Sequence, residues 1–422
     1  MSAFQVLESL VPRGAVLDLG PVTAALAALG DPQASIPALH VAGTNGKGSA
    51  CAMVAAALRA AGVRAGLYTS PHLHRFEERM RVDGEPADAR LTERFALELR
   101  DLVARGEAPP LTFFEAATCV AWRVFAHHHA RLAVLEVGLG GRLDATRVCA
   151  PWVTAITRIA LDHQGYLGPD LVSIAREKAG IAREGVPLLL GPGITDPAVK
   201  DAIVRVARDA NAPWREVPPP RVLGSDGAGH HTLATSYLGR AFTVRLGLAG
   251  AHQCDNAAVA VAVLEEAARR GLPITPEAVE DGLSSVRWPG RLERVADALL
   301  DGAHNLDGVD ALLRALPTVL PEGPSSLVFG ASSDKPWRAM LDLLQRAVPS
   351  ERWVLAQAEL SRAVAPETLA APFGAAWAPT VAAALESARA HGGITLVCGS
   401  LHLVAAARAH LLKLTEDPRV GL

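Results

Sequence analysis

The residues with the most evident chemistry lie at positions 40–49, in the sequence HVAGTNGKGS. They end an apolar run, Ile36 to Ala42, and lead into an alanine-rich stretch, Ser49 to Ala61. This order predicts a strand, a glycine loop and the start of a helix. Glycines let the backbone turn tightly and expose N–H groups, and a helix N-terminus adds positive partial charge. Lys47 can reach outer phosphates and Ser49 can hold Mg²⁺, so the segment predicts a cradle for a nucleoside triphosphate.

The glycine spacing in this loop leaves a second interpretation open. The pattern Gly43-x-x-Gly46-Lys47-Gly48-Ser49, with Thr44 and Asn45 at the variable positions, is shorter than the general GxxxxGK[ST] loop. A plain Gly-rich turn between a strand and a helix would give a similar pattern. A lysine beside two glycines at the end of a buried strand favours the phosphate-binding interpretation.

A carboxylate and an imidazole follow two further predicted strands. Glu136 lies at the end of the apolar run Leu132 to Val137, before a glycine-rich loop. Backbone amides could satisfy it, but an unpaired buried carboxylate costs on the order of several kcal/mol, which favours a cation such as Mg²⁺ as its partner. His163 follows the run Val153 to Ile159, where a neutral imidazole can complete a metal site. A lone histidine is more often a surface or capping residue.

Lysine and histidine residues on predicted helices carry weaker signals. Lys178 lies within the predicted helix Leu171 to Arg183, and an ion pair with Glu136 or Glu177 is a sufficient explanation for it. The tract from His127 to His129 cannot converge on one ion, because adjacent helical residues point to different sides. We interpret that tract as a solvated helix end.

Polar loops also follow predicted strands in the second half of the chain. In Asp301-Gly-Ala-His304-Asn305, the aspartate could take ribose hydroxyls and the histidine or asparagine could touch a nucleotide. Arg291 follows Trp288-Pro-Gly, where the proline ends a helix and the glycine permits a turn. Its guanidinium could swing onto phosphates when two domains close, or merely bridge the domains. The loop from Ser332 to Lys335 adds polar groups, and the two rims are expected to face each other.

These residues are positioned by a βαβ rhythm. Continuous rather than alternating hydrophobicity favours strands buried on both faces of a mostly parallel sheet, with ligands at their carboxyl ends. We predict an α/β protein with a P-loop-type sheet flanked by helices in residues 1–287, and a smaller Rossmann-like α/β domain in residues 293–422. A small antiparallel appendage is expected over residues 232–246. The predicted strands are 36–42, 63–69, 132–137, 153–159, 187–191, 296–301, 325–331, 352–356 and 394–399.

Composition narrows the class of protein. A chain of 422 residues with 50% hydrophobic and 20% charged residues can fill two domain cores. The net charge of −3, without a basic stripe, argues against nucleic acid or an anionic membrane as partner. Five cysteines without a CxxC pair indicate reduced thiols. No basic segment followed by an apolar one opens the chain, and no apolar run reaches about 18 residues, so we expect a cytoplasmic protein. We expect a monomer.

Together the motifs resemble the folylpolyglutamate synthase / dihydrofolate synthase family, a branch of the ATP-dependent amide ligases that includes the Mur ligases. The resemblance spans nearly the whole chain, and the shared order of its pieces is highly specific. The matching segments are HVAGTNGKGS at 40–49, TSPHL at 69–73, RFEERM at 75–80, TFFE at 112–115, LEVGLGGRLDAT at 135–146, LDH at 161–163, EKAGI at 177–181, the AHQ…N segment at 251–256, WPGRLE at 288–293, DGAHN at 301–305 and FGASSDKP at 329–336.

The resemblance implies roles for particular residues. Lys47 and the loop amides would bind the β- and γ-phosphates of ATP. Ser49 would help a first Mg²⁺, and a second Mg²⁺ would be held by Ser70, Glu136 and His163. The lysine matching Lys178 is often carbamylated in this family. In the second domain, Asp301 and His304 would contact the nucleotide, with Arg291 near the phosphates and Asn256 near the adenine or linker.

The resemblance also implies an acyl-phosphate reaction that ends in an amide with L-glutamate. Members that add the first glutamate to dihydropteroate, besides extending folates, resemble this chain at GGRLDAT, so we expect both activities. The expected substrate contacts are Phe114, Arg142, Asp144 and Ala145, with Arg142 on a carboxylate and the other two loop residues on the pterin. The family often continues GAHN with Pro-His, and DAT with Asn. This chain has Leu306-Asp307 and Arg147 at those places.

Three alternatives remain. The enzyme could carry out polyglutamation only. A Mur-type amino-acid ligase would share the ATP chemistry but normally needs an extra N-terminal domain, and the segment before the first strand is shorter than a typical domain of about 50 residues. A non-catalytic nucleotide switch would need the phosphate loop but not Glu136, His163 and Asp301.

Overall fold

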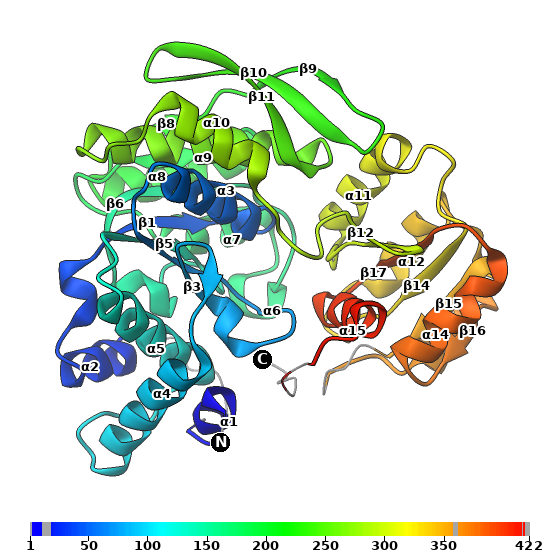
Figure 1. The fold of residues 1–422 in the computed structure, drawn as a ribbon, viewed down its shortest axis with the longest axis horizontal. Coiled ribbons are helices and arrows are strands. Elements are labelled where there is room, and N and C mark those ends of the chain that lie inside the picture. Colours follow the sequence, from blue (N-terminus) through cyan, green and yellow to red (C-terminus); the bar gives the residue numbers. More distant parts are fainter. Residues whose placement is uncertain (1, 11–17, 358–361, 416, 418–422) are drawn as a thin grey trace.

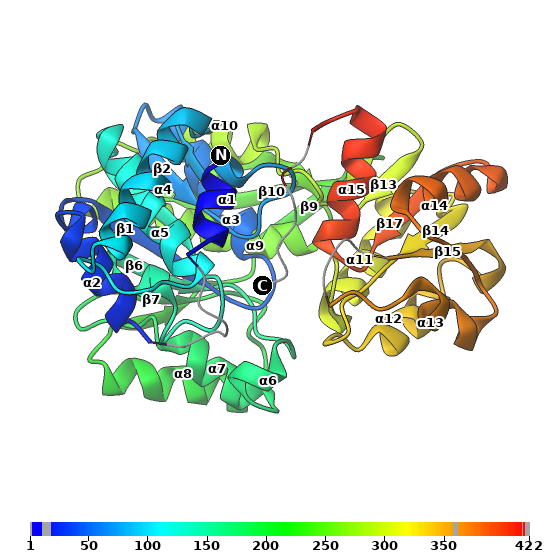
Figure 2. The ribbon, with the colours of Figure 1, turned by 90° about the horizontal axis from the view of Figure 1, so that it is seen from below.

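The computed structural model describes residues 2–10, 18–357, 362–415 and 417. The chain forms a larger α/β body, a three-stranded sheet above it and a smaller α/β body beside it (Figure 1). Turning the molecule by 90° shows the two bodies side by side (Figure 2). The fold class predicted from the sequence is confirmed.

The large sheet has eight strands in the order β4-β3-β2-β5-β1-β6-β7-β8. All neighbours are parallel except at β3 and β4, which pair antiparallel at one edge. In the central register Val41 on β1 lies opposite Glu136 on β5, so both strands end at the same edge. The strands are β1 (Pro37–Ala42), β2 (Ala65–Tyr68), β3 (Met80–Val82), β4 (Glu85–Pro86), β5 (Leu132–Glu136), β6 (Ala150–Ile156), β7 (Leu188–Leu190) and β8 (Trp214–Glu216).

Helices cover both faces of this sheet, as continuous hydrophobicity predicts. Leu39 and Val41 belong to a core shared with α3, α9 and α10, whereas Ala38 belongs to a core shared with α4 and α5. The helices are α1 (Ala3–Glu8), α2 (Gly20–Ala28), α3 (Lys47–Ala60), α4 (Ala89–Ala104), α5 (Phe113–His127), α6 (Gln164–Leu167), α7 (Leu171–Ala179), α8 (Pro197–Asp209), α9 (His252–Arg269) and α10 (Pro276–Ser285), with 3-10 turns η1 (Pro32–Ser35), η2 (Phe76–Arg79) and η3 (Ala145–Val148).

The predicted antiparallel appendage consists of β9 (Arg221–Ser225), β10 (His230–Tyr237) and β11 (Arg240–Ala249). Its inner side chains, among them Leu233, Tyr237 and Leu246, are buried in the same core as α3 and α9. The sheet is therefore an integral layer over the phosphate-loop helix.

The smaller body contains a six-stranded sheet in the order β12-β13-β17-β14-β15-β16, parallel except for the β12–β13 pair. Helices α11, α12 and α13 contribute to the core on one face, and α14 and α15 to the core on the other. The elements are β12 (Glu293–Val295), β13 (Ala298–Leu300), α11 (Leu306–Val319), β14 (Ser326–Phe329), α12 (Trp337–Leu344), η4 (Ser350–Arg352), β15 (Trp353–Ala356), α13 (Pro366–Ala370), η5 (Ala371–Phe373), β16 (Ala376–Ala378), α14 (Val381–Ala388), η6 (Arg389–His391), β17 (Thr395–Cys398) and α15 (Leu401–Leu412).

One predicted strand was wrong in a way that affects the site. β6 ends at Ile156 instead of Ile159, because its neighbours β1 and β7 also end at this level, where Ala42 and Leu190 pair with Ile156. His163 therefore lies on a loop beyond the strand, as the N-cap residue of α6.

Three further expectations can be compared with the structure. All five cysteines are free and buried, as predicted. Within the described ranges, no helix has the length and apolar character needed to cross a membrane. His127 ends α5 and is exposed, which agrees with the interpretation of the histidine tract as a solvated helix end.

Candidate active site

The glycine loop joins β1 to α3 and is held by the chain around it. Gly43 and Gly46 have φ angles of 147° and 87°, and a Cβ on Gly46 would lie 2.2 Å from Asn256 Oδ1. Thr44 donates from its backbone N–H to the Arg158 carbonyl at 2.7 Å. The N-cap residue of α3 is Gly46, so no side chain caps this helix. The first N–H groups of α3 are therefore available to an anion.

Glu136 lies beside this loop, at the end of β5. Its carboxylate is 7% exposed and accepts a hydrogen bond from the backbone N–H of Ser70 at 3.2 Å. A Cβ on Gly48 would lie 3.2 Å from Glu136 Oε2, so the carboxylate reaches the first turn of α3. Burial raises the pKa of Glu136, and the charge of Lys47 opposes that rise.

This arrangement fits Mg²⁺ better than a metal held by the protein alone. Among the described residues, no three His, Cys, Asp or Glu side chains are grouped as a metal site. Mg²⁺ is commonly held by one or two carboxylates together with substrate phosphates and water. Glu136 offers a buried carboxylate with acceptor capacity beyond its bond to Ser70. Ser49 is buried on α3, where its hydroxyl accepts from Gln253 Nε2 at 3.4 Å.

His163 belongs to the same electrostatic neighbourhood. Its backbone N–H donates to Asp162 Oδ1 at 2.8 Å. Burial lowers the pKa of His163 to about 4, an effect that Asp162 opposes and that the charges of Lys335, His304 and Lys47 increase. The positive charge of Lys47 therefore acts on both Glu136 and His163.

Lys178 does not form the ion pair that its alternative interpretation expected. Its buried Nζ donates to the Gly43 carbonyl at 2.9 Å. Glu177 is paired instead with Arg142, whose Nη2 lies 3.0 Å from it. Burial, helped by the charge of Lys47, lowers the pKa of Lys178 to about 7. A substantial fraction of this lysine is therefore a neutral amine at physiological pH.

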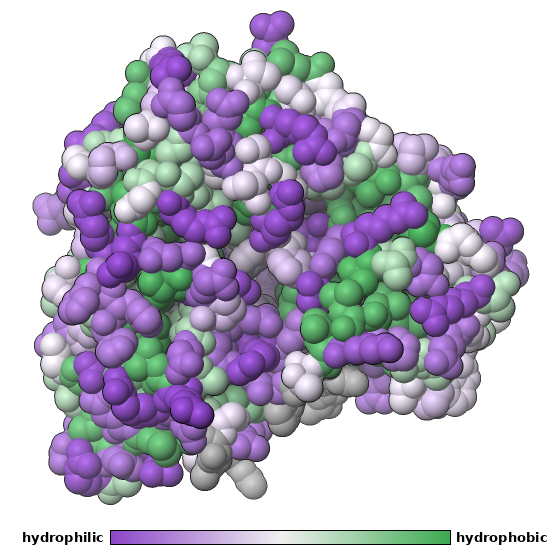
Figure 3. Space-filling model, viewed as in Figure 1, coloured by the Kyte–Doolittle hydropathy of each residue, from purple (hydrophilic) through white to green (hydrophobic). Residues whose placement is uncertain are grey.

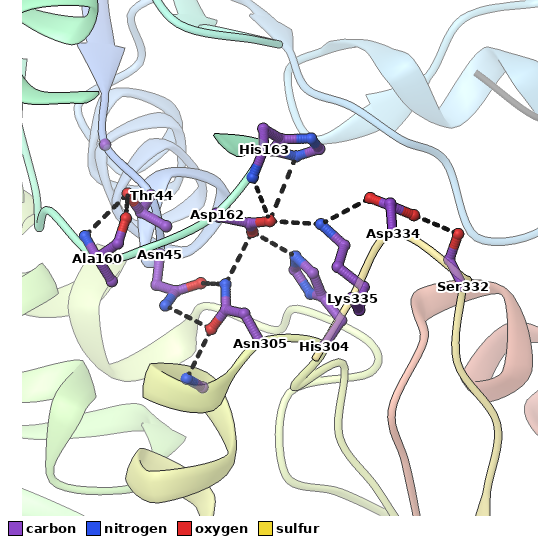
Figure 4. Close-up of polar contacts among 12 residues, drawn as sticks. Thr44, Asn45, Ala160, Asp162, His163, His304, Asn305, Ser332, Asp334 and Lys335 are labelled. Atoms are coloured by element: carbon purple, nitrogen blue, oxygen red, sulfur yellow. Dashed lines mark hydrogen bonds and ion pairs between the residues drawn. The ribbon is translucent and has the colours of Figure 1, made fainter. Parts of the chain in front are cut away.

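The smaller body meets the larger one at Asp162 (Figure 4). The carboxylate forms an ion pair with Lys335, lies 3.5 Å from His304 Nε2 and accepts from Asn305 Nδ2 at 2.9 Å. Burial by itself would raise the pKa of Asp162, but the hydrogen bond from His304 and the neighbouring positive charges hold it well below its usual range. The space-filling view shows a hollow between the bodies, bordered largely by polar residues (Figure 3).

A second contact joins the phosphate loop to the smaller body. Asn45 Nδ2 donates to Asn305 Oδ1 at 3.1 Å and to Asp307 Oδ2 at 2.8 Å. Arg158 donates from Nε to Asp307 Oδ1 at 2.8 Å. Asp307 is one of the two departures noted in the sequence, and here it serves as a contact between the bodies.

The predicted nucleotide residues of the smaller body lie near the junction. Asp301 is buried and accepts from the backbone N–H groups of Leu292 and Ala303, both at 2.9 Å, so its carboxylate also shapes the loop. A Cβ on Gly302 would lie 2.0 Å from Arg291 Nη1, which places the guanidinium on that loop. Asn256 instead contacts the phosphate loop at Gly46.

The predicted substrate loop follows β5. Asp144 accepts from the backbone N–H of Leu139 at 2.8 Å and of Thr146 at 3.0 Å, and from Thr146 Oγ1 at 2.5 Å. The same hydroxyl lies 2.8 Å from His40 Nε2. Asp144 therefore organises the loop, and Ala145 beside it is buried.

Two predicted substrate contacts flank this loop. The Phe114 ring packs where a Cβ on Gly138 would lie, 2.5 Å from Phe114 Cζ. Arg142 is half exposed and paired with Glu177. Arg147, the second departure noted in the sequence, donates from Nε to the Gly180 carbonyl at 2.7 Å and so ties the loop to the end of α7.

Sequence reasoning assigned no role to Asp162, Asp307 or Arg158, and it gave Asn305 only a possible nucleotide contact. The motifs LDH, DGAHN and FGASSDKP contain the residues that meet at Asp162. No single motif shows that these residues pair across the two bodies. Nor did the sequence indicate that His40 touches the substrate loop.

Comparison with known proteins agrees with this geometry. The family model for the Mur ligase glutamate ligase domain matches residues 290–401. The chain is 35% identical over 424 residues to the dihydrofolate synthase/folylpolyglutamate synthase of Escherichia coli, covering 98% of this chain and 95% of that protein. The Bacillus subtilis protein of the same name is 32% identical, with coverage of 93% and 94%.

Solved structures give the same result. The E. coli FolC structure with DHPP and ADP has a TM-score of 0.83 and 34% identity, and 95% of each chain is covered. The Mycobacterium tuberculosis folylpolyglutamate synthase structure with ADP has a TM-score of 0.86 and 30% identity, and 98% of each chain is covered.

Proposed function

Since the chain belongs to the folylpolyglutamate synthase/dihydrofolate synthase family of ATP-dependent ligases, we propose that it joins L-glutamate both to dihydropteroate and to folyl-glutamates. The observations that carry this proposal are that Glu136 reaches the first turn of α3 and that Asn45 of the phosphate loop contacts Asn305 of the smaller body, next to His304. Similarity to the E. coli FolC structure with DHPP and ADP supports the pterin acid as a substrate.

In the proposed first step, an oxygen of the substrate carboxylate attacks the γ-phosphorus of ATP. The bond to the ADP oxygen breaks, giving an acyl phosphate and ADP. Lys47 and the N–H groups at the start of α3 hold the phosphates and offset their growing charge. Two Mg²⁺ ions, one helped by Ser49 and one held by Ser70, Glu136 and His163, would neutralise phosphate charge.

In the second step, the neutral amine of L-glutamate attacks the acyl carbon. Inorganic phosphate leaves, and the nitrogen loses a proton as the amide forms. The acyl phosphate must be kept from water until then, which requires the smaller body to stay closed over the phosphate loop. The contacts of Asn305 with Asn45 and Asp162 provide such a closed arrangement.

Other predicted residues support these steps. Lys178, a neutral amine for part of the time, can react with CO2 to give a carbamate, which would present oxygen atoms beside Gly43. Arg291, Asp301 and Asn256 border the nucleotide, and Phe114, Arg142, Asp144 and Ala145 border the pterin acid. The two predicted domains, residues 1–287 and 293–422, would each supply one side of the site.

One assay separates this function from its alternatives. ADP release and product mass are measured with L-glutamate plus either dihydropteroate or tetrahydrofolate. Turnover with both acids supports the dual activity, and turnover with tetrahydrofolate alone indicates polyglutamation only. Stimulation by a UDP-muramoyl peptide would indicate a Mur-type ligase. Tight ATP binding without turnover would indicate a nucleotide switch.

A further inference from the structure

Asp162 has an unusual set of partners for a residue with no assigned part in the reaction. It lies on the loop before α6 of the larger body, and its side chain is 5% exposed. Lys335, His304 and Asn305 of the smaller body all meet this one carboxylate (Figure 4). Asp162 also accepts from the backbone N–H of His163, so it is held from its own side as well.

The three partners come from two loops that follow parallel strands of one sheet. His304 and Asn305 follow β13, and Lys335 follows β14, with β17 between these two strands in the sheet. The carboxyl ends of parallel strands are where α/β sheets present functional groups. The smaller body therefore contacts Asp162 at the edge formed by the carboxyl ends of its parallel strands.

Asn305 connects this contact to the phosphate loop. Its Nδ2 donates to both Asp162 Oδ2 at 2.9 Å and Asn45 Oδ1 at 3.1 Å. Its own Oδ1 accepts from the N–H of Gly308 at 2.8 Å, which caps α11. A displacement of Asp162 would therefore move Asn305, which contacts both the phosphate loop and the start of α11.

We propose that Asp162 is a positioning residue for the ligation, whose carboxylate seats Lys335, His304 and Asn305 and so fixes the closed position of the smaller body over the phosphate loop. The proposal rests on the proposed function for its kinetic consequences. Removing one partner of a buried charge pair leaves the other uncompensated, so the closed position depends strongly on this pair. Separation of the bodies exposes both charges to water, which makes the contact reversible.

The kinetic signature of such a residue differs from that of a binding residue. Because the triphosphate is expected to bind mainly the first N–H groups of α3, Asp162→Asn should lower kcat by a larger factor than it raises the KM for ATP. Misplacement of reacting groups by about 1 Å can cost on the order of 100-fold in rate, so kcat for ligation should fall on the order of 10- to 100-fold. ADP release without amide formation should rise relative to ligation, because an open site admits water.

The test uses Asp162→Asn, Lys335→Met and the double variant in the full chain. If the two residues act as one pair, the double variant loses no more kcat than the worse single variant. Losses that multiply would overturn the proposal. Arg408→Met is the matched control, because its Nη1 contacts His74 across the bodies at 3.0 Å, away from Asp162. An equal loss of kcat in that control would also overturn the proposal.

Small-angle X-ray scattering provides a readout that needs no catalysis. The radius of gyration should increase in Asp162→Asn and Lys335→Met but not in Arg408→Met. An unchanged radius in both variants would contradict the seating role. A wild-type protein that fails to ligate glutamate would refute the proposed function, while the scattering comparison would still decide the role of Asp162.

Discussion

Lys178 on α7 donates a hydrogen bond to the carbonyl of Gly43, the first glycine of the phosphate loop, at 2.9 Å. The contact joins a helix on one side of the site to the loop that is expected to hold ATP. It also removes the lysine from water, which lowers its pKa to about 7.

The first prediction concerns carbamylation of Lys178. Because the lysine pKa is about 7, the reactive neutral amine predominates above that pH and disappears below it. Ligase activity should therefore rise between pH 6 and pH 8 and respond to bicarbonate at the upper end. A ¹³C resonance of a carbamate should appear in wild-type protein with ¹³C-bicarbonate and be absent in Lys178→Met. Equal spectra for the two proteins would remove this modification from the account.

Glu136→Gln should change activity and stability in opposite directions. The substitution keeps the shape of the side chain but removes its buried negative charge. Because burial raises the pKa of Glu136, the charged form is disfavoured there, and the melting temperature should stay equal or increase. Loss of the charge beside the phosphates should lower kcat on the order of 100-fold and raise the Mg²⁺ concentration needed for half activity. Calorimetry and a Mg²⁺ titration check the two effects. Full activity at unchanged Mg²⁺ would contradict the proposed metal role.

Gly46→Ala tests the geometry of the phosphate loop. The alanine would have to adopt a φ angle of 87° with its Cβ 2.2 Å from Asn256 Oδ1. We expect kcat/KM for ATP to fall at least about tenfold, with a stability loss beyond the roughly 1–2 kcal/mol of left-handed backbone strain. Gly62→Ala is the control, because its φ is 68° and nothing lies within 4 Å of a Cβ there. The control should lose stability only; a comparable loss of ATP use in it would argue against a specific role for Gly46.

His40 predicts a particular response to acid. Burial, with the charges of Arg183 and Arg147, lowers its pKa from 6.5 to about 3. Between these pH values the unfolded chain binds a proton at His40 and the folded chain does not. The free energy of unfolding therefore decreases as pH falls from about 6.5 toward 3. At 1.36 kcal/mol per pH unit, this group contributes roughly 2 kcal/mol of the loss between pH 6.5 and 5.

His40→Gln should remove that part of the slope, whatever its effect on stability at pH 7. The measurement is urea unfolding of wild type and variant at several pH values. His127→Gln, at the exposed end of α5, should keep the wild-type slope. Parallel curves for wild type and His40→Gln would show that the folded and unfolded chains bind a proton at His40 equally well, contrary to this account of its pKa.

The fold could be predicted in large part because its main signals are local. The run from Ile36 to Ala42 is apolar except for His40, and β1 is buried on both faces. Short edge strands such as β4, which contains Pro86, and β12 have too few residues to show a hydrophobic pattern in the sequence. The end of β6 was misplaced because apolar residues continue to Ile159, whereas strand length is set by the ends of β1 and β7.

The candidate site was predictable only where a motif is contiguous. The glycine loop and Glu136 lie next to their strands, so spacing alone located them. Asp162 and Lys335 are far apart in sequence and belong to different bodies, and their pairing depends on how those bodies dock. His40 resembles any buried strand residue until the structure shows Thr146 Oγ1 beside its ring.

The acyl-phosphate mechanism can be tested by following the oxygen atoms of the substrate carboxylate. Dihydropteroate is labelled with ¹⁸O in its carboxylate and incubated with the enzyme, ATP, Mg²⁺ and L-glutamate. If the carboxylate attacks the γ-phosphoryl group, one ¹⁸O atom is transferred to inorganic phosphate for each amide formed. Amide formation with no ¹⁸O in the released phosphate would contradict the acyl-phosphate mechanism on which the account depends.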